Sequence, residues 1–126
     1  MRLLLDTHLL LWWLCNDKSL SALARSLIAN PENTVCVSAV SHWEIRLKQS
    51  LGKLELPSDF DTKLADEPFE LLPLTAASAT QFGLLPWHHR DPFDRMLVAQ
   101  AQVENLTLLT ADKALTAYGA LVKLVK

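Results

Sequence analysis

The sequence predicts an α/β fold: one domain, residues 1–126, with a mainly parallel central sheet flanked by helices. Short, uninterrupted apolar runs recur along the chain, as is typical of strands that are covered on both faces. Segments with helical periodicity lie between these runs. The length of 126 residues fits one compact domain, and a hydrophobic content of 50% suits a packed core.

The first half of the chain begins with a strand and alternates from there. In order, we expect a strand at residues 2–5, helices at 8–14 and 21–28, a strand at 34–37 and a helix at 40–51. Ser21 is a candidate N-cap for the second helix, and Pro31 follows its end. Gly52 is well placed as the C-terminal stop of the third helix.

The second half of the chain continues the alternation. We expect a short helix at 60–65, a strand at 69–74, helices at 76–84 and 91–104, an apolar strand at 106–109, a short helix at 113–118 and a closing strand at 122–125. Pro73 weakens the prediction of a strand at 69–74, because proline lacks the N–H that a sheet requires. Asp91 as N-cap, with Pro92 at the first helical position, explains the start of the long helix.

The charge balance excludes a protein that binds nucleic acid through a strongly basic surface, because the net charge is −2. A nucleic-acid substrate would therefore be held by a local basic patch or by metal ions among carboxylates.

Hydropathy and cysteine usage indicate a cytoplasmic protein that does not enter the membrane. The run at residues 9–14 is far shorter than the about 20 apolar residues that a membrane-spanning helix needs. Cys15 and Cys36 have no zinc-site spacing, and we expect two free, buried thiols in a reducing compartment.

Two acidic residues follow apolar strands. Asp6 comes directly after the first strand, and Asp112 lies three residues past Leu109. Because the carboxyl ends of parallel strands meet at one edge of a sheet, both would lie on the same rim, where α/β proteins place their working sites. The alternative for each residue alone is a capping role for the helix or turn that follows.

Glu44 lies within a helical pattern rather than after a strand. Helical geometry puts it on one stripe with four apolar residues, namely Val40, Trp43, Leu47 and Leu51. A carboxylate on a buried face needs a partner or a metal. The alternative is a capping box from Ser41 to Glu44, which requires the helix to start at Ser41.

Asp94 is in the same situation on the helix that opens at Pro92. It heads a stripe that continues through Leu97, Val98 and Ala101. The alternative is electrostatic, because an acid in the first turn favours the helix dipole.

Four carboxylates on one rim would repel one another, and a divalent cation resolves the conflict. Hard cations such as Mg²⁺ and Mn²⁺ prefer oxygen ligands. A cation held in this way activates water and stabilises charge on a phosphate, so phosphodiester hydrolysis is the natural chemistry.

Four segments of the chain, taken in order, resemble the PIN-domain nucleases, and most closely the toxin half of bacterial VapBC-type toxin–antitoxin pairs. These segments are residues 3–7, 37–45, 89–97 and 108–112. Each segment alone is weakly specific, whereas all four in this order, in a chain this short, are highly specific.

The resemblance implies metal-dependent cleavage of RNA by water, with no covalent enzyme intermediate. It implies that Asp6 and Asp94 hold the principal Mg²⁺ or Mn²⁺. Glu44 would bind metal or orient water, and Asp112 would complete the catalytic set. The resemblance also implies a cognate antitoxin that covers the acidic pocket, and a homodimer.

Several neighbouring residues bear on this resemblance. Thr7 and Thr110 match small polar positions beside the acids. His8 departs from the small Asn or Ser that many members carry two residues after the first Asp. Arg95 is the best candidate for a contact to RNA phosphate, because it follows Asp94 directly.

The remaining side chains are of lower interest. His88 and His89 are interpreted as ordinary polar surface. Trp12 and Trp13 are adjacent and cannot both point inward, so one of them is a candidate anchor for a dimer or antitoxin contact.

Three other functions are compatible with parts of the sequence. A phosphatase-like hydrolase would use Asp6 as nucleophile, but it wants a second Asp two residues on, where His8 stands. A receiver-like signalling module would need a phosphoacceptor Asp at the end of a central strand in mid-chain, and none is found. A degenerate PIN domain would only bind its partner.

Overall fold

The computed structural model describes residues 1–126 and contains a five-stranded, wholly parallel sheet with the order β3-β2-β1-β4-β5. The strands are β1 (Arg2–Leu5), β2 (Thr34–Ser38), β3 (Glu70–Leu72), β4 (Thr107–Thr110) and β5 (Val122–Leu124). The helices are α1 (Thr7–Leu14), α2 (Ala22–Ala29), α3 (Ala39–Ser50), α4 (Phe60–Asp66), α5 (Ala76–Leu84), α6 (Pro92–Glu104) and the 3₁₀ helix η1 (Lys113–Tyr118). The predicted α/β class and parallel sheet are confirmed.

The expected elements are all present, with small shifts at their ends. Ser21 caps α2 as predicted, and its hydroxyl accepts the N–H of Ala24. The strand expected at 69–74 is reduced to β3, which ends at Leu72 immediately before Pro73. This shortening follows from the missing N–H of proline, which cannot continue the ladder.

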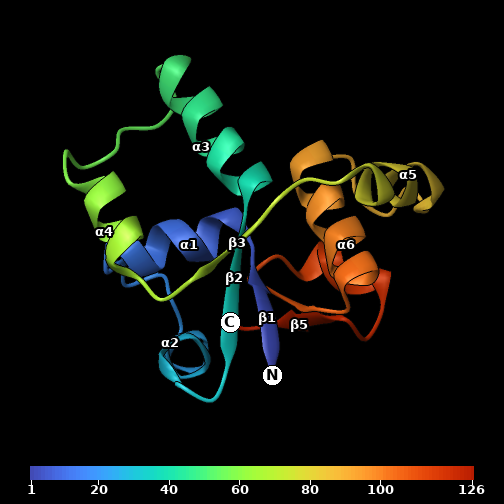
Figure 1. The fold of residues 1–126 in the computed structure, drawn as a ribbon, viewed down its shortest axis with the longest axis horizontal. Helices are drawn as coiled ribbons and strands as arrows, with labels where there is room; N and C mark the ends of the chain where they lie inside the picture. Colours follow the sequence, from blue (N-terminus) through green and yellow to red (C-terminus); the bar gives the residue numbers. More distant parts are fainter.

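Two apolar layers, one on each face of the sheet, hold the fold together. Successive strand residues point to opposite faces, so Leu3 and Leu5 pack against α1, α2 and α4, whereas Leu4 packs against α6 and η1. Figure 1 shows these helices on the two sides of the strands, with α5 packed outside α6. Burial on both faces explains why the strands contain so few polar residues.

The central position of β1 determines where a site can form. The chain runs from β1 outward through β2 to β3, then crosses to β4 and β5 on the other side of β1. The direction of winding therefore reverses beside β1. In open α/β sheets, the crevice beyond the carboxyl ends of the strands at such a reversal is the usual binding site.

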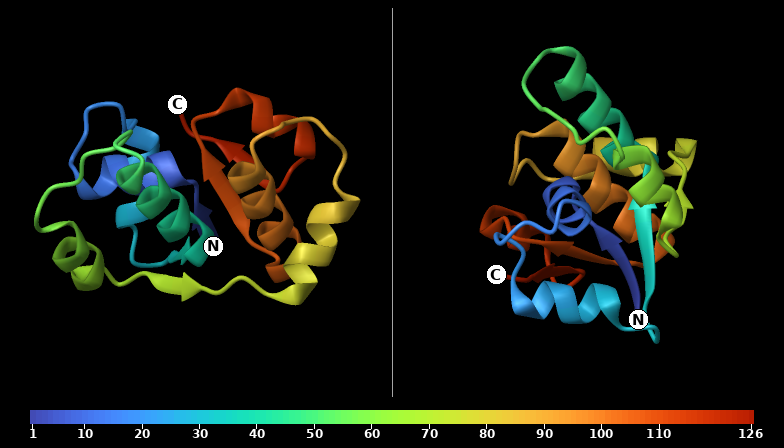
Figure 2. Two further views of the ribbon diagram at one scale, coloured as in Figure 1. Left: turned by 90° about the horizontal axis from the view of Figure 1, so that it is seen from above. Right: turned by 90° about the vertical axis from the view of Figure 1, so that its left-hand side faces the viewer.

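The helix α3 leaves the carboxyl end of β2 and projects away from the sheet (Figures 1 and 2). Its buried residues are Val40, Ser41, Glu44 and Ile45, whereas Trp43, Leu47 and Leu51 are exposed. The predicted apolar stripe is therefore wrong for those three residues. Because α3 packs on neighbours only along one narrow side, the rest of the stripe is left uncovered, and the ring of Trp43 contacts that of Phe93 at 5.0 Å between centroids.

The two thiols are free, as expected, but only Cys36 is buried. The prediction of a buried Cys15 is wrong, because this residue lies at the C-cap of α1, where the helix leaves the core. None of the helices combines the length and the apolar character that crossing a membrane requires.

Candidate active site

Asp6 lies at the junction of β1 and α1, in the middle of the sheet, with 3% of the residue exposed. Its Oδ1 accepts the backbone N–H of Leu9 at 2.8 Å, so it caps α1. Its Oδ2 accepts the hydroxyl of Thr110 at 2.5 Å. Burial nevertheless raises the pKa of Asp6 above its usual value, despite these two hydrogen bonds, which lower it.

Asp112 lies past the end of β4 on the same rim. Its Oδ1 accepts the N–H of Ala114 and caps η1, so the capping role considered for both Asp6 and Asp112 is present in each. Thr110 joins the two acids, because its hydroxyl oxygen also accepts the N–H of Asp112 at 3.0 Å. The cap and the site are compatible, since a capping carboxylate keeps lone pairs for another ligand.

Glu44 is buried on the side of α3 that faces α1. The hydroxyl of Thr7 donates to its Oε1 at 2.7 Å, and Nζ of Lys48 lies 2.5 Å from its Oε2. Helix α3 begins at Ala39 with Ser38 as its N-cap, so the capping box from Ser41 to Glu44 does not form. The prediction of a buried, partnered carboxylate is confirmed.

Asp94 lies in the first turn of α6, one turn after the N-cap Asp91, which accepts the N–H groups of Phe93 and Asp94. The pKa of Asp94 is raised to about 7, mainly because burial disfavours the carboxylate. The negative charges of Asp91, Asp6 and Glu44 raise it further. This carboxylate is therefore surrounded by other acids and short of positive charge.

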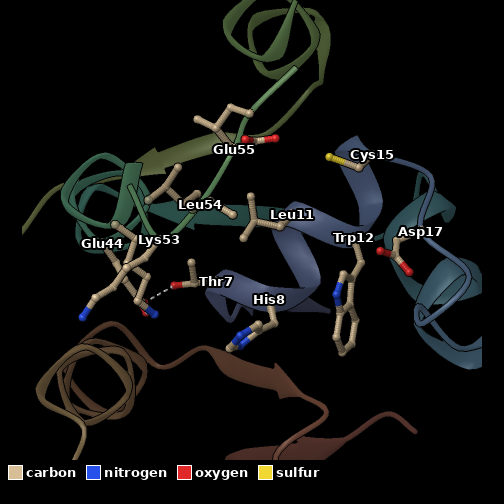
Figure 3. Close-up of a pocket in the computed structure, with 13 residues that line it drawn as sticks. Thr7, His8, Leu11, Trp12, Cys15, Asp17, Glu44, Lys53, Leu54 and Glu55 are labelled. Carbon is tan, nitrogen blue, oxygen red and sulfur yellow. Dashed lines mark hydrogen bonds and ion pairs between the residues drawn. The ribbon is translucent and has the colours of Figure 1, made fainter. Parts of the chain in front are cut away.

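A cavity of about 270 Å³, here called the acidic cavity, is lined by Asp6, His8, Trp12, Asp94, Ala111 and Asp112. Glu44 opens instead onto a neighbouring hollow of about 540 Å³ between α1 and α3, called the α1–α3 groove. His8 and Trp12 line both spaces. Figure 3 shows the groove, with Thr7 directed toward Glu44 and with Lys53 beside them.

His89 belongs to this site, although the sequence suggested ordinary surface. Its Nε2 lies 3.0 Å from Oδ2 of Asp112 and 3.8 Å from Oδ2 of Asp94. Its Nδ1 accepts the N–H of Asp91 at 3.1 Å, so in the neutral ring the proton is on Nε2 and is directed at Asp112. The sequence held one signal: His89 stands two residues before the N-cap of the helix that carries Asp94.

Arg95 does not reach the site, and its predicted contact to RNA phosphate is wrong. Only 1% of the residue is exposed. Its guanidinium donates to the carbonyl oxygens of Pro86 and Phe82 and lies 3.6 Å from the ring centroid of Trp87. Adjacent residues on a helix do not point the same way, so Arg95 faces Phe82, Pro86 and Trp87 rather than the acids beside Asp94.

The exposed tryptophans are also not those expected. Trp12 and Trp13 are half-buried, and Trp13 donates to Glu67 through its Nε1. Trp43 and Trp87 are instead 59% and 71% exposed.

The residues present fit a hard divalent cation. One ligand atom from each of His89, Asp94 and Asp112 lies within 4.8 Å of the others, and Asp6 lines the same cavity. Because Nδ1 of His89 already accepts a backbone N–H, its Nε2 carries a proton and the carboxylates are the better ligands. Oxygen donors in this number suit Mg²⁺ or Mn²⁺ better than zinc.

The sequence matches a known family, and the fold matches several solved structures. A family model described as the PIN domain matches residues 3–121. The fold is similar to a chain of VapBC2 from Rickettsia felis bound to a DNA fragment from their promoter, with a TM-score of 0.76, 17% identity and 100% coverage of both chains. It is also similar to a chain of a toxin–antitoxin complex from Klebsiella pneumoniae, with a TM-score of 0.67, 19% identity and coverage of 98% and 97%.

A third solved structure, VapBC-5 from Mycobacterium tuberculosis, contains a chain that matches with a TM-score of 0.62, 20% identity and coverage of 99% and 98%. A search of curated proteins finds no match to the sequence.

Proposed function

Since this chain belongs to the PIN-domain family, we propose that it is a Mg²⁺- or Mn²⁺-dependent endoribonuclease that hydrolyses RNA phosphodiester bonds. Its catalytic carboxylates are Asp6, Glu44, Asp94 and Asp112. The observation that carries the proposal is that Asp6, Asp94 and Asp112 line one cavity, where burial among other acids raises the pKa of Asp94 to about 7. A cation at this place relieves the repulsion and puts positive charge where a phosphate would bind.

Asp6 and Asp94 are the proposed metal ligands, and Asp112 lines the same cavity. When bound, the cation supplies an activated water and neutralises charge on the phosphate. Thr110 and the N–H of Leu9 keep the Asp6 carboxylate fixed in one orientation and lower its pKa, which favours the ionised form that binds metal.

Glu44 and Asp112 act from the two sides of Asp94 in this proposal. Glu44, oriented by Thr7 and Lys48, accepts a hydrogen bond from the attacking water. Asp112 is held by Nε2 of His89. Hydrolysis places the oxygen of water on phosphorus and a proton on the ribose oxygen that leaves, with no bond to the enzyme.

We propose further that this nuclease is the toxin of a toxin–antitoxin pair in the cytoplasm, inhibited by a cognate antitoxin and assembled as a homodimer. The support is its similarity in fold, over nearly the whole length, to chains of toxin–antitoxin complexes. Trp43 adds support for a protein contact, because it is exposed beside an apolar cavity that Phe93 and Met96 also line.

The phosphatase-like alternative is less well supported. Asp6 as nucleophile would need an oxygen that the phosphorus can approach in line, but only 3% of the residue is exposed, and His8 stands where such an enzyme wants a second Asp. A domain that only binds its partner remains the outcome to test against.

The test is cleavage of total bacterial RNA by the purified protein without antitoxin, in Mg²⁺, Mn²⁺ or EDTA. We expect discrete fragments that require metal and that are lost in the double variant Asp6→Asn/Asp94→Asn. A matched control, Asp59→Asn/Asp61→Asn, makes the same change in charge on and beside α4 and is expected to retain activity.

Three outcomes separate the alternatives. Cleavage that persists in the Asp6→Asn/Asp94→Asn protein would assign the activity to a contaminant or to another site. Absence of cleavage by the folded wild-type protein, with both metals and many RNAs, would favour the partner-binding domain. Metal-dependent cleavage lost only in the site variant supports the nuclease.

A further inference from the structure

Two side chains able to carry positive charge contact members of the set of four acids. His89 contacts Asp112 and lies near Asp94. Lys48 contacts Glu44 through its Nζ. Arg95 is buried and donates to backbone carbonyl groups instead. Among the lysines and arginines, Lys48 is therefore the one that forms an ion pair with a site carboxylate.

Lys48 is much more exposed than the glutamate that it contacts. The side chain of Lys48 is 40% exposed and that of Glu44 only 3%. Both residues line the α1–α3 groove, and Lys48 is the more exposed of the two. A ligand that approaches the acids from this side meets the ammonium first.

Lys48 also retains hydrogen-bonding capacity. An ammonium group has three N–H donors, and the single acceptor found for it within the protein is Oε2 of Glu44. The hydrogen bond to Glu44 and the charge of Glu44 raise the pKa of Lys48, and the negative charges of Asp91 and Asp94 raise it further. Two of its N–H groups are thus free to bind another acceptor.

The pairing with Glu44 leaves the role of Lys48 incompletely explained, since Glu44 is already held by Thr7 at its other oxygen. We propose that Lys48 is a catalytic residue that donates an N–H to a non-bridging oxygen of the scissile phosphate while it keeps its contact with Glu44. This inference rests on the proposed nuclease function. It adds a direct contact between the protein and the substrate phosphate, which the proposed function does not include.

The contact explains how a chain of net charge −2 accepts a polyanion at an acidic site. A protonated lysine beside the carboxylates lowers the repulsion felt by the phosphate as it enters. The same N–H then stabilises the negative charge that grows on the phosphate oxygens as water attacks. Lys48 stays protonated throughout, so the step requires no proton from it.

The first experiment compares RNA cleavage by Lys48→Met, Lys48→Arg and the wild-type protein. Methionine keeps the length of the side chain and removes the charge. We expect kcat/KM to fall about 100-fold in Lys48→Met, as for loss of one donor to a developing oxyanion, and to be largely restored in Lys48→Arg. Lys63→Met on α4, where the lysine pairs with Asp59, is the control that keeps full activity.

A second experiment separates a substrate contact from a role through Glu44. Binding of a single-stranded RNA oligonucleotide is measured against salt concentration, without metal, in the inactive Asp6→Asn/Asp94→Asn protein with and without Lys48→Met. One lost phosphate contact lowers the slope of log K against log salt by about 0.7 for a single strand. A lysine that only orients Glu44 leaves the slope unchanged.

The outcomes are distinct from those of the proposed function. If the wild-type protein cleaves RNA but Lys48→Met cleaves it equally well, or if the salt slope does not change, the inference about Lys48 is wrong and the nuclease function stands. If the wild-type protein cleaves no RNA, the proposed function itself fails. A fall in kcat/KM together with a smaller slope supports the contact.

Discussion

Thr110 donates a hydrogen bond of 2.5 Å to Oδ2 of Asp6, although the two residues are 104 positions apart in the chain. The contact exists because β1 and β4 are adjacent parallel strands, with Leu5 paired to Leu109. The next residue on each strand therefore lies at the same rim of the sheet. Thr110 is thereby a direct support for the proposed metal ligand.

This contact predicts weaker metal binding in Thr110→Val. Valine keeps the shape and removes the donor, so the pKa of Asp6 rises further and its ionised form becomes less populated. Loss of such a supporting hydrogen bond lowers metal affinity about 10- to 100-fold. Isothermal titration with Mn²⁺ measures the change. Thr34→Val, at the start of β2, is the control, and equal Mn²⁺ affinity in the two variants would refute the role of Thr110.

The raised pKa of Asp94 predicts how stability depends on pH. The carboxyl titrates near 3.8 in its ordinary state and at about 7 in the folded protein. Between these values the folded state binds the extra proton, so this group makes the metal-free protein less stable as pH rises from about 4 to about 7. Above pH 7 the full loss is present.

Melting temperatures at pH 5 and pH 8, for the wild-type protein and Asp94→Asn in EDTA, test this sign. We expect the wild type to lose stability relative to the variant as the pH rises, and added Mg²⁺ or Mn²⁺ to raise the wild-type Tm more at pH 8 than at pH 5. Parallel pH curves for the two proteins would show that Asp94 ionises normally.

Arg95 is expected to matter for stability rather than for RNA binding. Arg95→Met removes the guanidinium hydrogen bonds to the carbonyl oxygens of Pro86 and Phe82, and it removes the stacking on Trp87. A loss of about 2–3 kcal/mol in the free energy of unfolding is the scale for losing the hydrogen bonds of a buried charged group. Urea denaturation measures it, and Arg90→Met, at an exposed neighbouring position, should change little.

The same prediction states that Arg95 makes no contribution to RNA binding. Under conditions in which Arg95→Met is folded, the salt dependence of RNA binding should equal that of the wild-type protein, in contrast to Lys48→Met. A reduced slope in Arg95→Met would return this arginine to the substrate-binding surface.

His89 is expected to position Asp112 through Nε2. His89→Gln can place an amide N–H near Asp112, whereas His89→Leu cannot. We therefore expect a loss in kcat of about 10-fold for His89→Leu and a smaller loss for His89→Gln, measured with RNA at saturating Mn²⁺. If both variants lose the same activity, or neither does, the hydrogen bond to Asp112 has no role in the reaction.

The local sequence determined much of this protein. Apolar runs, helical periodicity and the caps Ser21 and Asp91 predicted the strands and helices, because these signals depend on residues within a few positions of one another. The same local logic placed Asp6 and Asp112 at strand ends. The parallel class followed from the alternation of elements.

The order of the strands was decided only in three dimensions. Pairing of β1 with both β2 and β4 puts Asp6 at the centre of the rim and brings Thr110 to it. No local pattern contains this information, because the pairing depends on how whole layers pack. The candidate site therefore includes the strand pairing that brings Thr110 to Asp6, in addition to the acids that the sequence indicated.

The tertiary structure likewise decided which polar side chains meet those acids and which face other neighbours. Periodicity fixes the side of a helix on which a residue lies, but a neighbouring element determines whether that side is covered. Arg95 is covered by the segment after α5, Trp43 on α3 is left exposed, and His89 is brought to Asp112 by the loop before α6. The sequence by itself predicted the elements and indicated the four acids, whereas the packing of distant segments decided which side chains contact those acids.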